Sequence, residues 1–141
     1  MTIEKHARLQ TGLLLRRLAL QVNRAAKSCD AEAVHDLRVS IRRLSRCLRV
    51  FSRFYPDGSW KKIRRRLKTL MEVAGPVRDM DIATEFLAEM EIGKASPLVH
   101  FMAQSRRAAR RELESEVRTW KERGFSKRWR TTLGLNGVTK A

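Results

Sequence analysis

The fold is decided by residues 34–51, which read VHDLRVSIRRLSRCLRVF. Apolar side chains recur there every three or four residues, which is the spacing of one face of an α-helix. At about 100° per residue they fall within roughly 100° of the helix circumference: Val34, Leu37, Ile41, Leu44, Leu48 and Phe51. This stripe predicts a helix that begins after Asp30 as its N-cap, ends near Tyr55 and packs one face against other helices.

A neighbouring face of the same helix is basic. One histidine and five arginines fall within about 80° of the circumference: His35, Arg38, Arg42, Arg46, Arg49 and Arg53. Like charges at i,i+4 repel, and solvated faces usually mix charges of both signs. The stripe therefore favours an anion-binding surface, with a face that serves solubility alone as the alternative. An isolated His35 would more often be structural, but its place on the stripe favours binding.

The whole chain is strongly basic. Its 141 residues include 31 Lys+Arg and 15 Asp+Glu, which gives a formal net charge of +16. This length suits one domain, and the 43% apolar content excludes a wholly disordered basic tail. The charge indicates a polyanionic partner: nucleic acid, an anionic membrane surface or polyphosphate. Because aromatic residues make up only 6%, we expect an aliphatic core.

Several classes of protein are not expected. The chain has no apolar run of about 18 residues, so we expect no membrane span. The first residues lack the pattern of a secretory signal. Cys29 and Cys47 are too few for a disulfide or metal framework, and they fit a reducing, cytoplasmic setting. The histidines are scattered at positions 6, 35 and 100, so we expect no metal site.

Proline and glycine divide the chain into helical segments. Helices are expected over residues 4–27, 30–55, 59–74, 76–93 and 97–123, with a short last helix over 125–133. Short connections favour antiparallel neighbours, so the sequence predicts an all-α, antiparallel bundle of four to five main helices. We expect the domain to cover residues 1–135 and residues 136–141 to form a flexible C-terminal tail.

The segment 59–74 carries a second basic strip. Its apolar face is flanked on one side by Lys61, Arg64, Arg65 and Lys68. The tight turn at residues 56–59 should make this helix antiparallel to the preceding one, so that both basic strips line one groove. We expect Gly75 and Pro76 to end it and to open the next helix, where free backbone N–H groups beside Arg78 would also favour anions.

Two acids follow Arg78 in the same predicted first turn. Asp79 and Asp81 would stabilise a helix N-terminus, or orient Arg78 or another base. They do not read as a catalytic pair, because no nucleophile or metal-binding set accompanies them. The stretch 79–91 holds five acids and no base, so the charges along the chain are segregated.

These motifs resemble one known family, the CHAD domain (conserved histidine α-helical domain). The resemblance rests on VHDLRVSIRRL at residues 34–44, then on LKTL at 67–70 and GPVRDMDI at 75–82. It covers about residues 3–135. It implies a module of two related four-helix bundles that binds inorganic polyphosphate, is associated with polyphosphate granules and often accompanies triphosphate-handling catalytic domains.

By matching positions, the resemblance implies six ligand contacts: His35, Arg38, Arg42, Arg43, Lys68 and Arg78. The helical wheel adds four more candidates: Arg46, Arg49, Lys61 and Arg64. Ser45 stands where the family often has a basic residue. No second His-x-x-Arg helix follows, so the chain resembles about half of a full domain. We expect a homodimer in which a second copy completes the two-bundle domain; a shortened chain or a half-bundle acting alone is the alternative.

The sequence thus predicts a non-catalytic polyphosphate-binding module without cofactor or metal, in the cytoplasm and associated with polyphosphate granules. A nucleic-acid-binding helical protein is the alternative. Few aromatic residues accompany the basic strips, and there is no helix-turn-helix or zinc-finger signature, which weakens that alternative. An enzyme acting on phosphorylated substrates would need a metal-binding acid set or a nucleophile amid the basic residues, and none stands there.

Overall fold

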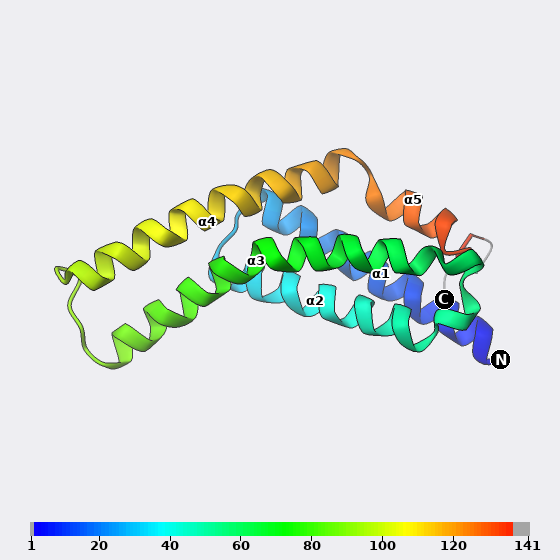
Figure 1. Cartoon of the computed structure of the whole chain (residues 1–141), viewed down its shortest axis with the longest axis horizontal. Coiled ribbons are helices and arrows are strands. Elements are labelled where there is room, and N and C mark those ends of the chain that lie inside the picture. The colour runs from blue at the N-terminus through cyan, green and yellow to red at the C-terminus, as the bar shows by residue number, and fades with distance from the viewer. Residues whose placement is uncertain (1, 137–141) are drawn as a thin grey trace.

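The computed structural model describes residues 2–136, and these contain five α-helices and no strand. The helices are α1 (Ile3–Lys27), α2 (Ala31–Val50), α3 (Ser59–Glu89), α4 (Pro97–Glu122) and α5 (Phe125–Thr132). The first four pack in a ring, in which each helix contacts the next and α4 returns to α1 (Figure 1). The short α5 packs against α1. The predicted all-α antiparallel bundle is confirmed.

Local signals in the sequence set most helix ends. Asp30 caps α2, because its side chain accepts a hydrogen bond of 2.8 Å from the backbone N–H of Ala33. Ser96 caps α4, and Pro97 occupies the first turn, where a missing N–H costs nothing. Gly124, with a φ of 59°, separates α4 from α5. These three boundaries are as the sequence predicts.

The helix boundary predicted at Gly75 and Pro76 is wrong. The helix α3 runs through both residues, from Ser59 to Glu89. An interior proline removes one hydrogen bond and costs about 3 kcal/mol. Ala74 and Val77 on either side of it are fully buried, so packing continues across the proline and offsets that cost. The axis of α3 changes direction along its length (Figure 1), as expected for a helix with an interior proline.

The end of the second predicted helix also differs. The helix α2 ends at Val50 rather than near Tyr55, and a 3-10 turn over Ser52–Phe54 follows it. Arg53 therefore leaves the helical stripe, and its guanidinium lies 5.9 Å from the centroid of the Phe54 ring. A second 3-10 turn at Pro56–Gly58 completes the tight connection to α3.

The core is aliphatic along most of the bundle and aromatic near α5. The predicted apolar stripe of α2 is buried, except that Phe51 is only partly so. Near α5, Trp120, Phe125 and Trp129 pack edge to face with ring centroids 5.0 to 5.2 Å apart. The expectation of an aliphatic core is therefore wrong at this end. Leu135, the last residue of the predicted domain, is also buried. Of the predicted tail, residues 137–141 lie outside the described residues.

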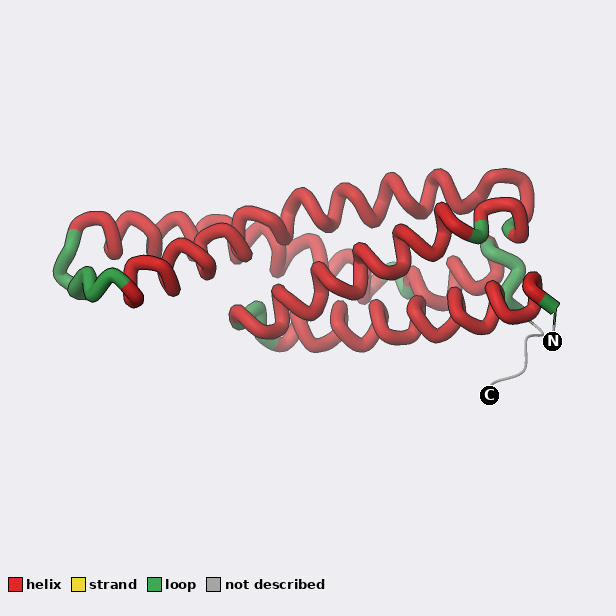
Figure 2. The backbone as a smooth tube through the Cα atoms, turned by 90° about the horizontal axis from the view of Figure 1, so that it is seen from below, coloured by secondary structure: helices red, strands yellow, loops and turns green. Residues whose placement is uncertain are grey.

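One guanidinium joins three parts of the chain. Arg106 of α4 donates from Nε to the buried carboxylate of Asp81 on α3. Its Nη2 donates to the backbone carbonyl of Cys29, between α1 and α2, at 2.9 Å. Asp81 thus orients a base, although that base is Arg106 and not Arg78. Beyond this contact α3 and α4 extend as a two-helix hairpin (Figure 2).

Removal of the Asp81 carboxylate should destabilise the fold. In an Asp81→Ala variant the guanidinium of Arg106 stays partly buried without its counterion, and breaking such a pair costs about 3 kcal/mol. The free energy of unfolding can be measured by urea denaturation. Asp79→Ala is the matched control, because Asp79 is exposed two residues away, and its expected change is within about 0.5 kcal/mol. Equal effects of the two substitutions would contradict this role for Asp81.

Candidate functional site

Burial of the apolar stripe of α2 turns its basic face outward. His35, Arg42, Arg43, Arg46 and Arg49 are exposed. Arg38 is half-buried. Because the apolar side chains occupy the other side of the same helix, these cations cannot turn into the core. The fold therefore holds a row of positive charges at the surface of α2.

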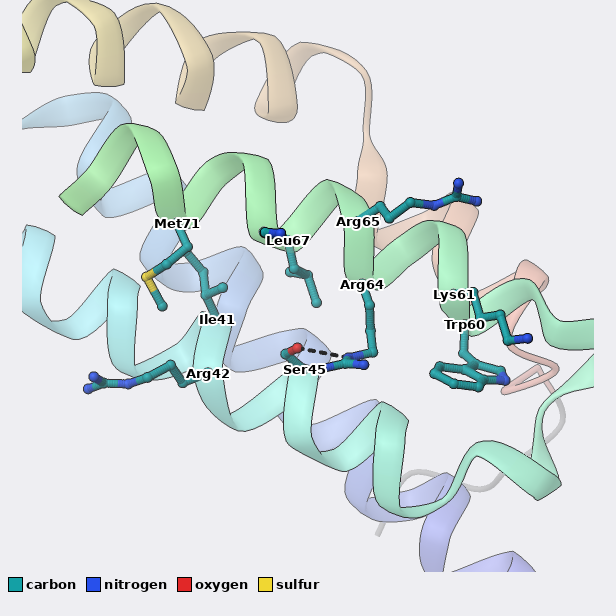
Figure 3. Close-up of a pocket in the computed structure, with 10 residues that line it drawn as sticks. Ile41, Arg42, Ser45, Trp60, Lys61, Arg64, Arg65, Leu67 and Met71 are labelled. Atoms are coloured by element: carbon teal, nitrogen blue, oxygen red, sulfur yellow. Dashed lines mark hydrogen bonds between the residues drawn. The ribbon is translucent and has the colours of Figure 1, made fainter. Parts of the chain in front are cut away.

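A groove of about 550 Å³ lies between α2 and α3. Its floor is apolar and includes the buried side chains of Ile41 and Leu67. Around this floor, the described residues place five cationic side chains and no acidic one: Arg42, Lys61, Arg64, Arg65 and Lys68. The remaining lining residues are Ser45, Trp60 and Met71 (Figure 3). We call this site the basic groove; its position between the two helices is the one that the sequence predicts.

Arg64 is the most firmly positioned cation of the basic groove. Its Nε donates a hydrogen bond of 3.1 Å to the hydroxyl oxygen of Ser45, across the groove from α3 to α2 (Figure 3). This bond fixes the guanidinium plane and leaves both terminal nitrogens free for another acceptor. Ser45 thus serves to orient an arginine from the neighbouring helix.

The two ends of the basic groove differ in character. Arg42 lies at one end, and Trp60 with Lys61 lies at the other (Figure 3). The ammonium of Lys61 is 5.7 Å from the centroid of the Trp60 ring, within the range of a cation–π contact. Trp60 is half-buried and faces the groove. The groove therefore offers one aromatic surface beside its cations.

Four of the ten candidate residues line the basic groove: Arg42, Lys61, Arg64 and Lys68. The other six do not line it: His35, Arg38, Arg43, Arg46, Arg49 and Arg78. Arg38 lies one turn before Arg42 on α2, and its buried Nε has no hydrogen-bond partner within residues 2–136. Arg78 is half-buried in the middle of α3, so the free N–H groups expected beside it are engaged in the helix and cannot bind an anion.

The sequence reasoning omitted Arg65 and Trp60 from the candidate contacts. Arg65 belongs to the basic strip already recognised beside the apolar face of α3. Trp60 lies four residues before Arg64, which places both on one side of the helix. The helical spacing alone could therefore have identified both residues.

The candidate cations form no salt bridge with a carboxylate in the described part of the chain. Within the described part of the chain, the salt bridges involve Arg8, Arg24, Arg106 and Arg110. None of the ten candidate residues takes part. Neighbouring cations without counterions repel one another, and a bound polyanion would relieve this repulsion.

Metal ligands and the reactivity of Cys29 can be assessed in the described residues. Among residues 2–136, no group of three or more His, Cys, Asp or Glu side chains could hold a metal ion. Burial raises the pKa of the Cys29 thiol to about 11, so it stays protonated and is a poor nucleophile at neutral pH. None of the helices in this part of the chain is both long and apolar enough to cross a membrane.

Fold and site together define an all-α module with a cationic groove. A family model for the CHAD domain matches residues 10–140, so the chain belongs to the CHAD domain family. This family consists generally of binding modules and is associated with polyphosphate. No curated protein and no solved structure is similar enough to the chain to count as a match.

The raised pKa of Cys29 should make the fold less stable in alkali. The folded-state pKa of about 11 lies above the ordinary value of 9.0, so the contribution is complete below pH 9 and is lost as pH rises toward 11. In a Cys29→Ala variant the free energy of unfolding should fall less steeply between pH 9 and pH 11. Urea denaturation at several pH values in this range gives the slope of unfolding free energy against pH for each protein. Identical slopes for the two proteins would contradict a raised pKa of Cys29.

Proposed function

We propose that the chain binds inorganic polyphosphate in the basic groove and does not turn it over. The observation that carries this proposal is the lining of the groove, where five cationic side chains meet without a carboxylate. A guanidinium stays charged at any working pH and grips phosphate oxygens with two parallel N–H donors. Membership of the CHAD family, which is associated with polyphosphate, supports a linear polyphosphate as the ligand ahead of other polyanions.

Binding would begin at Arg64 and extend along the groove. Ser45 holds Arg64 in place, so little conformational entropy is lost when its terminal nitrogens meet phosphate. Arg42 and Lys68 would neutralise further phosphates. Arg38 and His35 continue along α2 toward its N-terminus, and Arg78 lies further along the antiparallel α3. These three, with Arg43, Arg46 and Arg49, are proposed contacts for the parts of a chain that extend beyond the groove.

The setting of this function is also a proposal. We propose that residues 1–135 form one binding domain, that it acts as a homodimer, and that it works in the cytoplasm with polyphosphate granules as its target. The family's association with polyphosphate supports the last point. The homodimer draws its support from an uncovered apolar surface of α3.

Replacement of the groove cations should weaken polyphosphate binding far more than removal of the same charge elsewhere on the surface. In the triple variant Arg42→Ala, Arg64→Ala, Lys68→Ala, three charge-assisted hydrogen bonds are lost, each contributing about 1.5–3 kcal/mol. Because 1.4 kcal/mol corresponds to tenfold, the affinity for polyphosphate measured by titration calorimetry should fall about 100-fold or more. By analogy with nucleic acids, its dependence on salt should also become shallower.

The matched control removes the same charges elsewhere. Arg107, Arg118 and Lys127 are exposed and do not line the basic groove, so their triple alanine variant should lose less than about fivefold through the reduced net charge. Equal losses in the two triples would mean that binding follows net charge and has no defined site.

Trp60 is the one observation in favour of a nucleic-acid ligand. An aromatic ring beside cations can stack a base, which contributes about 1–3 kcal/mol. Polyphosphate has no base, so Trp60→Leu should leave its affinity unchanged within about twofold. Fluorescence anisotropy of a labelled single-stranded DNA can follow its displacement by polyphosphate.

At equal phosphate concentration we expect polyphosphate to displace the DNA. If the DNA resists displacement, and if Trp60→Leu weakens DNA binding tenfold, the nucleic-acid alternative replaces the proposal.

A further inference from the structure

The hairpin formed by α3 and α4 has a surface that no other helix within residues 2–136 covers. The connection between α1 and α2 lies beside Asp81, Thr84 and Arg106, so α2 begins at the level where the hairpin starts (Figures 1 and 2). Within residues 82–112, Leu87 is the only buried residue. The face of α3 that continues past the start of α2 therefore meets solvent.

This uncovered face combines apolar and acidic side chains. Ile82 and Phe86 lie one turn apart, and their exposed fractions are 47% and 57%. Glu85 lies between these two residues in the sequence, and Glu89 follows Phe86; both glutamates are exposed. The four residues follow the spacing i, i+3, i+4, i+7 and so share one stripe of the helix. We call this stripe the acidic face.

A stripe with the same spacing and the opposite charge lies on α1. Leu13 and Leu20 are 40% and 60% exposed, and the exposed Arg16 and Arg17 stand between them. We call these four residues the basic face. Each stripe covers eight residues, and its first and last Cα atoms are about 10.5 Å apart along the helix axis. Within residues 2–136, no salt bridge engages Arg16, Arg17, Glu85 or Glu89.

We propose that a second copy of this chain covers both stripes, so that the acidic face of each copy packs on the basic face of the other. Two acidic faces would repel each other, as would two basic faces, so the charges select the unlike pairing. A two-fold axis makes this contact twice, and it covers four exposed apolar side chains in each copy. Neither stripe contains a residue of the basic groove, so the pairing does not depend on the ligand of that groove.

Charge reversal tests the pairing. One variant carries Glu85→Lys and Glu89→Lys, and a second carries Arg16→Glu and Arg17→Glu. Each places like charges on both stripes, so each alone should dissociate at least tenfold more readily than the original chain. In a mixture, every lysine stripe meets a glutamate stripe, which should restore association as a heterodimer. A chain with all four changes should again form a homodimer.

Sedimentation equilibrium gives the readout. The original chain should approach twice its monomer mass of 16.4 kDa at micromolar concentration. All four substituted side chains are exposed, so circular dichroism should show unchanged helicity and melting in the monomeric variants. A monomeric original chain at about 100 µM, or a mixture that stays monomeric, would overturn the proposal.

A matched pair of exposed apolar residues tests the apolar part of the contact. Phe86 on α3 is 57% exposed, and Val50 at the end of α2, which lies outside both stripes, is 70% exposed. Phe86→Gln should weaken the dimer at least tenfold, whereas Val50→Gln should change it less than twofold. Equal losses would overturn the assignment to the acidic face. Titration of polyphosphate into the monomeric Phe86→Gln variant separates this proposal from the proposed function, because the basic groove is intact in it.

Discussion

The structure depends on the division of α2 into an apolar face and a basic face. The apolar side chains can leave water only by packing against α1 and α3, and this burial fixes the rotation of the helix about its axis. Once the rotation is fixed, the arginines next to the buried stripe must face outward. The charge that opposes close packing of the chain is thereby concentrated where a polyanion can compensate it.

The neighbouring helix α3 completes the basic groove in the same way, because burial of one of its sides orients its cations. Ile63, Leu67 and Leu70 bury one side of α3, and this directs Arg64 and Lys68 toward the basic side of α2. The two helices thus share an apolar floor and surround it with cations. The hydrogen bond between Arg64 and Ser45 links the two sides at the centre. This arrangement of cations suits the binding of an anion, in keeping with the proposed function.

Much of the fold and part of the site could be predicted from the sequence. Helical periodicity predicts which side chains of α2 are buried. The caps at Asp30 and Ser96 can also be predicted, because capping is a local interaction. A boundary at Pro76 is the wrong prediction because Ala74 and Val77 on either side of it are buried in a core that several helices share, and a local pattern does not contain that packing. The partner of Asp81 could not be predicted either, since Arg106 lies 25 residues further along the chain.

We propose that the basic groove between α2 and α3 holds the polyanion. A crystal structure of the protein with a polyphosphate of defined length tests it most directly. We expect phosphate oxygens within hydrogen-bond distance, about 3 Å, of the terminal nitrogens of Arg64 and of at least one of Arg42 and Lys68. Phosphates seated instead on the exposed cations of α4 and α5, with an empty groove, would contradict it.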